Sequence, residues 1–234
     1  MRTLVLLAAL TVLCPSAHAA NKKKAPKAPA AAGARLIHIV GSVEVESGAQ
    51  KTGAKEGQPL ATGDWVTVPA GGTAVIELAD GTNLKLTANS RFQLTLPTKG
   101  SQITSGLLSF GGVFARVAKV LAGAQFDIRT ETAVAAVRGT EFFVAFGRPA
   151  KSGRDLWVCV NKGAVDVSTK SSKQALRVPA GKGILIKSGL DLTKPQAYEW
   201  TKQLNWNMDP KGGSLQDTTN LDSAYTDLLD QDYR

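Results

Sequence analysis

An interrupted alternation of apolar residues at positions 126–146 is the feature that most constrains the fold. Apolar side chains occupy every second position at its start, give way to alanines, and return on every second position from Phe142. Such alternation indicates a strand with one buried face. Val137 and Phe142 lie on opposite phases, so one residue must be absorbed between them if both face the same core. Gly139 is the natural place for a bulge, and residues 137–140 are therefore predicted to form a kinked strand in an all-β core.

The first 19 residues are predicted to be a secretory signal peptide. An apolar run over residues 4–13 follows a basic start, and small residues precede a cleavage point after Ala19, which is typical of exported proteins. The run is shorter than the roughly 20 residues that a membrane span needs. An alternative is a lipoprotein signal with lipid on Cys14, although the neighbouring Leu13 and Pro15 disfavour it. We expect a periplasmic protein without a transmembrane segment in the mature chain.

Residues 20–34 have the composition of a linker. Four lysines are interleaved with alanine, Pro26 and Pro29, and apart from the two prolines no apolar side chain is larger than alanine. Such a segment cannot bury a core, so we expect it to be disordered. It serves either as a solvated spacer or as a contact to anionic lipid or cell-wall polymer. Because it carries much of the net charge of +9, the basic balance does not indicate nucleic acid, and no nucleic-acid partner is expected.

Residues 35–189 contain many short apolar runs separated by glycine-rich turns, the pattern of one all-β domain. A sandwich, a barrel and an irregular solenoid all fit it. Asp80 and Gly81 form the strongest hairpin signal. Gly41 is predicted to join a first pair of strands, and Gly163 a later hairpin.

Helical periodicity competes with the strand pattern at residues 113–121 and governs residues 190–234. A helix is predicted to begin near Thr193, which with Gln196 and Pro195 resembles a capping box. It would pack on the β-domain. A second helical segment is acidic and is expected to be a docking peptide, a partly disordered tail or part of the fold. The apolar residues on the two helical faces are Ala197, Trp200 and Leu204, and Leu221, Ala224, Tyr225 and Leu228.

The sequence offers no metal or cofactor site. Once the signal peptide is removed, Cys159 is the only cysteine and His38 the only histidine, so neither an internal disulfide nor a site built from several of these ligands is available. Cys159 is predicted to be a buried small apolar residue. No cofactor is expected.

No catalytic constellation is predicted either. Glu44 and Glu46 are expected to lie on a solvated strand face, while Asp64 and Asp80 fit turn positions. His38 would be needed for any Ser-His-Asp triad, and it falls within a strand. The glycine pairs lack the lysine that a phosphate-binding loop requires. We therefore expect no enzyme activity.

Arg138 is the charged residue that needs an explanation, because it lies within an apolar run. A buried guanidinium is costly unless it is paired and hydrogen-bonded. Asp127 and Glu141 are the candidate partners, and turn carbonyl groups are another. The alternative is a contact with an anionic ligand.

The core resembles a FecR domain, the periplasmic module of iron-signalling anti-sigma regulators and of many stand-alone exported proteins. The resemblance rests on elements that follow one another in the family's order, from residue 35 to about residue 189. They are Gly41–Val45, Leu60–Val66, Gly72–Gly81, Gly106–Leu108, the signature Thr132–Phe142, Asn161–Val165 and Val178–Gly181. Val137, Arg138, Gly139, Thr140 and Phe142 form the centre of the signature, and their role is expected to be structural.

The resemblance implies an irregular β-solenoid or roll of many short strands, followed here by short C-terminal helices. The best-known members of the family pass a signal from an outer-membrane transporter to a cytoplasmic sigma factor. This sequence shows no cytoplasmic anti-sigma segment and no transmembrane helix, so sigma-factor control by this molecule alone is not expected.

We therefore predict a non-enzymatic periplasmic FecR-like protein that acts by binding, either as a sensor accessory or as an envelope scaffold. Its partner would be a protein of the cell envelope or a cell-wall polymer. The alternative function is a carbohydrate- or peptidoglycan-binding module that uses exposed aromatic residues such as Trp65 or Trp157.

Overall fold

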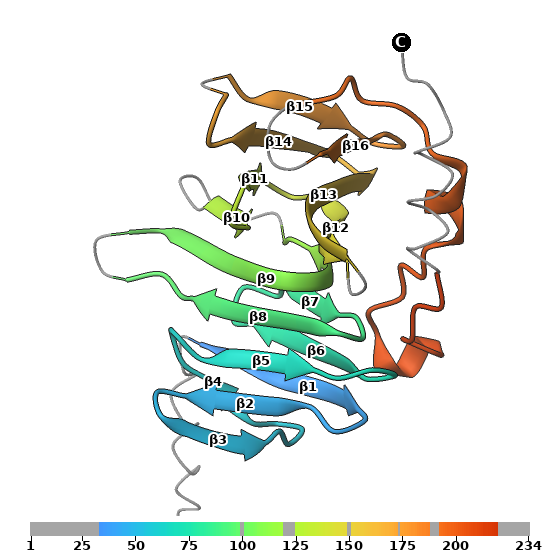
Figure 1. Ribbon diagram of the computed structural model, residues 1–234. Coiled ribbons are helices and arrows are strands. Elements are labelled where there is room, and N and C mark those ends of the chain that lie inside the picture. Colours follow the sequence, from blue (N-terminus) through green and yellow to red (C-terminus); the bar gives the residue numbers. More distant parts are fainter. Residues whose placement is uncertain are drawn as a thin grey trace, which may run out of the picture. The chain divides into compact units, whose positions relative to one another are not determined.

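The computed structural model describes residues 33–98, 101–118, 125–148, 151–172, 174–187 and 192–219. These residues are mostly in β-strands, with almost no helix, and the prediction of an all-β protein is confirmed. Sixteen strands join in one sheet that is not closed (Figure 1). The predicted signal peptide, most of the linker and the segment with Leu221 to Leu228 lie outside the described residues.

The strands form two hydrogen-bonded series, and we call the first one series A. Its strands in spatial order are β4 (Pro59–Leu60), β1 (Ala34–Val40), β6 (Thr73–Leu78), β7 (Asn83–Leu86), β9 (Ile103–Arg116), β12 (Glu141–Arg148), β13 (Lys151–Lys162) and β16 (Gly183–Ile186). Every neighbouring pair in this series runs antiparallel.

Series B runs beside it and shares β9. Its strands in spatial order are β3 (Gln50–Gly53), β2 (Glu44–Ser47), β5 (Trp65–Val68), β8 (Ser90–Thr95), β9, β10 (Gln125–Arg129), β11 (Ala133–Val137), β14 (Ala164–Thr169) and β15 (Leu176–Pro179). The first half of β9 pairs with β8 and β10, and its second half pairs with β7 and β12. The β9–β10 pair is parallel.

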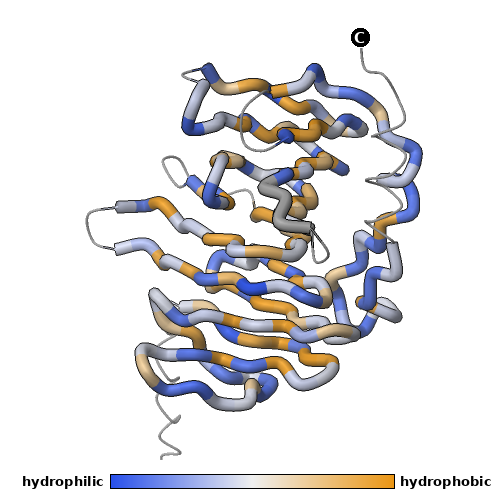
Figure 2. Tube along the Cα trace, in the orientation of Figure 1, coloured by the Kyte–Doolittle hydropathy of each residue, from blue (hydrophilic) through white to orange (hydrophobic). Residues whose placement is uncertain are grey.

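One hydrophobic core lies between the two series. Leu36 and Phe142 enter it from series A, and Phe92 and Ile128 enter it from series B, all of them buried. Apolar and polar residues alternate along many of the strands (Figure 2), as expected for strands with one buried face. Each series therefore presents a second face, turned away from this core.

The stretch at residues 126–146 is three strands rather than one kinked strand. β10 and β11 form a hairpin of series B, whereas β12 belongs to series A. Val137 and Phe142 are both buried in the core, 6 % and 0 % exposed. The change of phase between them takes place across a turn that carries the chain from one series to the other. Gly139 lies in this turn with φ of 61°.

Two predicted strand pairs are wrong for the same reason. Gly41 connects β1 to β2 and Gly163 connects β13 to β14, but in both cases the flanking strands belong to different series and do not pair. The turn sequence alone does not specify which strand the chain joins next. The hairpin at Asp80 and Gly81 is confirmed by the pairing of β6 with β7. Residues 113–116, where a helix competed, lie in β9.

The capped helix predicted at Thr193 does not form. The Thr193 side chain instead donates to the Leu185 carbonyl at 3.0 Å, and Gln196 pairs with Gly183 as an isolated bridge. Thr193 is therefore held at the edge of β16. Helical turns occur only as short 3₁₀ segments in the described part of this region, η1 (Glu199–Gln203) and η2 (Pro210–Gly212).

Candidate functional site

The outer face of series A is covered by the chain's own residues 193–219. Aromatic side chains of the two layers pack edge to face, with ring centroids 5.3 Å apart for Trp157 and Trp200 and also for Phe114 and Trp206. These rings and Leu204 belong to a second apolar cluster, separate from the core between the two series. Figure 1 shows the C-terminal segment running along this side of the strands. This face is thus not open to a partner in the structure.

Lys85 on β7 holds the covering segment in place. Its side chain is fully buried, its Nζ donates to the carbonyl oxygens of Asn205 and Asn207, and it lies 4.3 Å from the centroid of the Phe114 ring. Burial lowers the pKa of Lys85 to about 8, although the negative charge of Asp217 opposes that shift. An ammonium group in so apolar a place is tolerated because carbonyl oxygens surround it.

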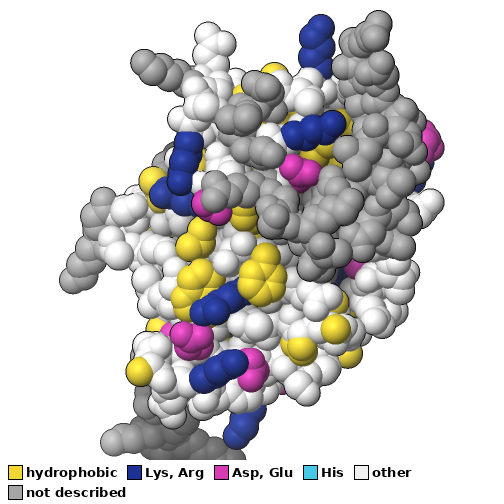
Figure 3. All heavy atoms as spheres, in the orientation of Figure 1, with side chains coloured by type: hydrophobic (Ala, Val, Ile, Leu, Met, Phe, Trp, Pro, Cys, Tyr) yellow, Lys and Arg dark blue, Asp and Glu magenta, His cyan; other side chains and the backbone are white. Residues whose placement is uncertain are grey.

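The outer face of series B carries charged side chains in ion pairs along the strands. They include Lys51 with Glu44 at 2.8 Å and Arg91 with Glu46 at 3.1 Å, so the predicted solvated positions of the two glutamates hold. Figure 3 shows basic, acidic and hydrophobic side chains side by side on one face. The ion pairs are partly exposed and contribute little to stability.

The signature residues sit where the chain crosses from series B to series A. Val137 ends β11, Phe142 lies in β12, and the turn between them contains Arg138, Gly139 and Thr140. Val137, Thr140 and Phe142 are buried, whereas Arg138 is exposed. Three of the signature residues therefore anchor the turn in the core and one points its charge outwards.

A second turn packs against this one. Gly163 adopts φ of 82°, and a Cβ atom added to it would lie 2.8 Å from Cγ2 of Thr140 and 3.3 Å from the carbonyl oxygen of Gly139. The Thr140 carbonyl accepts from the Val117 amide at 2.8 Å, and the Gly163 carbonyl accepts from the Ala180 amide at 3.0 Å. The two turns are thus fixed against each other and against neighbouring strands.

The carboxylates predicted to pair with Arg138 have other partners. Asp127 binds the Arg129 guanidinium through two hydrogen bonds of 3.0 Å, and Glu141 binds Arg116 at 2.9 Å. The prediction of a buried, internally paired Arg138 is wrong, because Arg138 lies in the turn after the strand rather than within it. Among the described residues, Arg138 has no ion-pair partner.

Glu141 anchors the base of the turn electrostatically. It is 4 % exposed and also accepts from Asn161 at 2.7 Å. Burial alone would raise its pKa, but the hydrogen bonds from Arg116 and Asn161 and the positive charges of Arg116 and Lys162 outweigh burial and keep the pKa below its ordinary value. Glu141 is ionised at neutral pH and is fully engaged, so it is a structural group rather than an acid or base.

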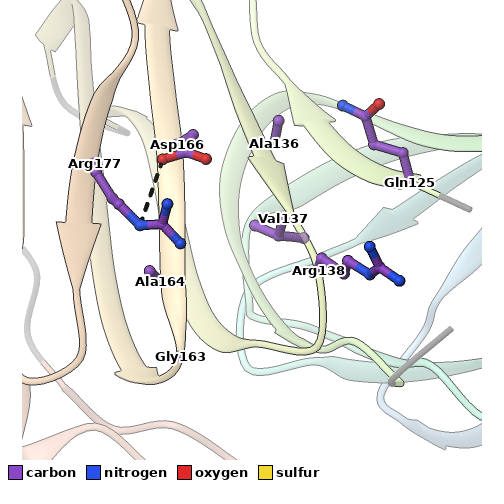
Figure 4. A pocket seen from close by; sticks show the side chains of 8 residues that line it. All are labelled: Gln125, Ala136, Val137, Arg138, Gly163, Ala164, Asp166 and Arg177. Carbon is purple, nitrogen blue, oxygen red and sulfur yellow. Dashed lines mark ion pairs between the residues drawn. The ribbon is translucent and has the colours of Figure 1, made fainter. Parts of the chain in front are cut away.

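A hollow of about 550 Å³ opens beside the signature turn (Figure 4). Its small residues come from β11 and from the Gly163 turn, and its two guanidinium groups come from the signature turn and from β15. Arg177 and Asp166, both exposed, form a loose ion pair of 4.0 Å. The lining residues are Gln125, Ala136, Val137, Arg138, Gly163, Ala164, Asp166 and Arg177. The arrangement is suited to binding an anionic group, because an arginine fork matches a carboxylate or phosphate.

Gln125 and Arg177 were not identified from the sequence as site residues. Both lie on strands whose neighbours become known only when the register is known, because Arg177 reaches the hollow through the pairing of β15 with β14. The alternation of β15 indicates an exposed side chain at this position, but no local signal predicts that it meets the signature turn.

The remaining candidate residues lie apart from the hollow. His38 contacts Glu56 at 3.0 Å, and Cys159 is buried as predicted, with a pKa that burial raises. Asp64 and Asp80 accept hydrogen bonds from turn amides of Ala61 and Thr82 at 2.8 Å, in agreement with their predicted turn roles.

No group of three or more histidine, cysteine, aspartate or glutamate side chains that could hold a metal ion occurs in the described part of the chain. The described residues also contain no helix that is long and apolar enough to cross a membrane.

The aromatic residues proposed to bind carbohydrate differ from each other. Trp157 is fully buried, so its part in that prediction is wrong, because the segment at 193–219 covers it. Trp65 is half-buried on the outer face of series B, with the Arg91 guanidinium 4.6 Å from its ring centroid. Phe110, opposite Arg91 in the strand register, is 44 % exposed.

Residues 64–166 match the family model described as FecR protein. This chain contains a FecR domain. The matched residues include the signature turn, the Thr140–Gly163 contact and most of the lining of the hollow. The candidate site is therefore largely part of the FecR domain itself, and only Arg177 comes from beyond it.

Two crystal structures, at 1.65 and 2.50 Å resolution, of a candidate anti-sigma factor from Parabacteroides distasonis are similar to this chain. Each is 23 % identical in sequence, covers 70 % of this chain and 72 % of its own, and has a TM-score of 0.52. At this identity the likeness shows a shared fold. No curated protein matches the chain.

Proposed function

We propose that this protein is a non-enzymatic FecR-domain module of the cell envelope that binds a protein partner through its signature turn, as a sensor accessory or scaffold. The observation that carries the proposal is Arg138, a charged residue of the FecR domain that is exposed at the rim of a hollow and has no ion-pair partner among the described residues. Exposed arginines with free guanidinium groups are common anchors of protein interfaces.

A signalling role is supported by the FecR domain and, at the level of fold alone, by the likeness to the candidate anti-sigma factor. Binding rather than catalysis fits the site, because its titratable groups are two arginines and one aspartate and none of them is placed to activate a nucleophile.

The proposal includes export to the periplasm. The apolar run at residues 4–13 and the small residues before Ala19 support cleavage there. Residues 20–34 would then be a linker, residues 35–189 the β-domain and residues 190–234 a C-terminal segment. Mass spectrometry of the mature N-terminus tests this part, and a lipid-modified start at Cys14 would overturn it.

The binding proposal is tested by cross-linking an affinity-tagged chain in its native host and identifying the adducts by mass spectrometry. We expect one envelope protein whose recovery falls about tenfold in Arg138→Ala, a loss equivalent to about 1.4 kcal/mol of binding. Arg35→Ala is the matched control, because Arg35 is also exposed but lies on β1 in a surface ion pair with Glu77. Equal recovery from the two variants would overturn the role of the signature turn.

A cell-wall polymer is the second candidate partner, and the exposed Phe110 favours it, together with Arg91, which is opposite Phe110 in the register and lies over the Trp65 ring. Aromatic faces on an open sheet provide stacking surfaces for sugar rings. Sedimentation with purified peptidoglycan tests this function. If it holds, Phe110→Ala and Trp65→Ala reduce the bound fraction while Arg138→Ala does not, and if no protein sediments with the polymer the candidate is eliminated.

A further inference from the structure

The hollow beside the signature turn has a positive rim and a floor made of small side chains. Arg138 is exposed and has no ion-pair partner among the described residues. Arg177 is 74 % exposed and stands 4.0 Å from Asp166, itself 50 % exposed, so this pair is exchangeable with another carboxylate. Asp166 is the one acidic group among the described lining residues. The hollow therefore favours an anionic occupant.

The floor shows what shape of occupant fits. Ala136, Gly163 and Ala164 line the hollow with small side chains, and in Figure 4 Arg177 and Arg138 lie to either side of Val137. The adjacent strand β15 lies at the end of series B, but Pro179 removes a donor from that edge. An occupant therefore binds mainly through side-chain carboxylates that contact the guanidinium groups. Backbone pairing with the edge of β15 contributes less.

The sequence itself contains such an occupant. Residues 220–234 hold four aspartates, Asp222, Asp227, Asp230 and Asp232, against one basic residue, Arg234. This segment follows directly on Thr219, whose amide donates to Asp217 at 2.7 Å, while Asp217 accepts from the Asn205 amide at 3.0 Å. Thr219, the residue before the acidic segment, is therefore tied to the covering segment of series A.

Reach and tethering make the contact feasible. The last aspartate, Asp232, lies 13 residues beyond Thr219 and can reach up to roughly 45 Å when the chain is extended, comparable to the roughly 40 Å across a domain of this size. A tether of this length gives an effective concentration on the order of millimolar, so a contact with a dissociation constant of about 1 mM is half occupied.

We propose that the Arg138 hollow is a carboxylate-binding surface and that the aspartates of residues 220–234 occupy it within the same molecule. A protein partner that uses this hollow must displace the segment. The inference concerns the same hollow as the proposed function, but whether residues 220–234 occupy that hollow can be tested without any partner.

The test is paramagnetic relaxation enhancement on the chain from residue 20 to 234 with a nitroxide attached to Ser223→Cys. The label is selective because Cys159 is fully buried. We expect the amide signals of Ala136, Arg138 and Ala164 to lose more than half of their intensity in the oxidised sample. The signals of Lys51 and Thr52, at the other end of series B, should keep theirs.

Two variants decide the result. Arg138→Gln, whose exposed position leaves the fold intact, should abolish the loss of intensity, and so should Asp227→Asn with Asp230→Asn and Asp232→Asn. About 0.5 M sodium chloride should weaken it by screening. The inference is overturned if the hollow's signals are unaffected by the label, or if they are broadened equally in both variants. If instead the label leaves the hollow untouched while partner cross-linking still depends on Arg138, the proposed function stands and only the internal occupancy is wrong.

Discussion

Lys85 Nζ donates a hydrogen bond of 2.8 Å to the carbonyl oxygen of Asn207, a residue 122 positions further along the chain. The contact joins the outer face of series A to the segment that covers it. Lys85 is fully buried against the Phe114 ring, so its ammonium group is removed from water. The fastening of the C-terminal segment is thus linked to the protonation of one side chain.

The first prediction concerns the pH dependence of this link. The pKa of Lys85 is about 8 in the folded protein against 10.5 when exposed, so the unfolded chain binds the extra proton between these two values. Stability from this group therefore rises as pH increases from about 8 to 10.5, by up to about 3 kcal/mol. Denaturant unfolding of the wild type and of Lys85→Met measures it. The free energy of unfolding of the wild type should rise relative to that of the variant over this pH range. If the two free energies change in parallel with pH, the pKa of Lys85 is not lowered in the folded protein.

The second prediction concerns the signature turn. Gly139 has φ of 61°, where a β-branched residue is strongly strained, so Gly139→Val should destabilise the fold by about 1–3 kcal/mol. For a domain of this size, each kcal/mol lowers the melting temperature by roughly 2–4 °C. Asn tolerates this conformation, so Gly139→Asn is the matched control and should lose much less. Equal melting temperatures for the two variants would mean that the turn relaxes to another conformation.

The third prediction concerns the contact between the two turns. In Gly163→Ala the new methyl group would meet Cγ2 of Thr140 at 2.8 Å at a residue with φ of 82°, and a loss of about 1–3 kcal/mol follows from the two effects together. Adding Thr140→Ser removes Cγ2 and should restore part of that loss, which a double-mutant cycle by thermal unfolding measures. Strict additivity of the two substitutions would contradict the contact.

The fourth prediction concerns Cys159. Burial raises the pKa of its thiol, and the thiolate is the reactive form, so a thiol reagent at about pH 8, close to the ordinary thiol pKa, should not modify the folded protein. Full reaction is expected once the chain is unfolded. Rapid modification of the native protein would show that the segment over series A opens readily.

Part of this architecture could be predicted from the sequence and part could not. Alternation and turn chemistry predict strands and the Asp80–Gly81 hairpin, because both are local properties. They do not specify which strand Gly41 or Gly163 leads to, because the choice between the two series depends on register over the whole sheet.

The same limit explains the side chains that were misplaced. Trp157 is buried because a segment distant in sequence covers it. Arg138 was expected inside a strand, but the chain changes series at that point and places it in solvent. Its exposure is the property on which the proposed function rests.

The central claim is that a partner binds at the signature turn. Site-specific photo-cross-linking tests it most directly, with a photoreactive amino acid in place of Gln125, an exposed lining residue that leaves Arg138 intact, and, in a second strain, in place of Arg35. We predict a light-dependent adduct with one envelope protein from position 125 and none from position 35. An exported, folded protein that forms no adduct from position 125, or the same adducts from both positions, would contradict the claim.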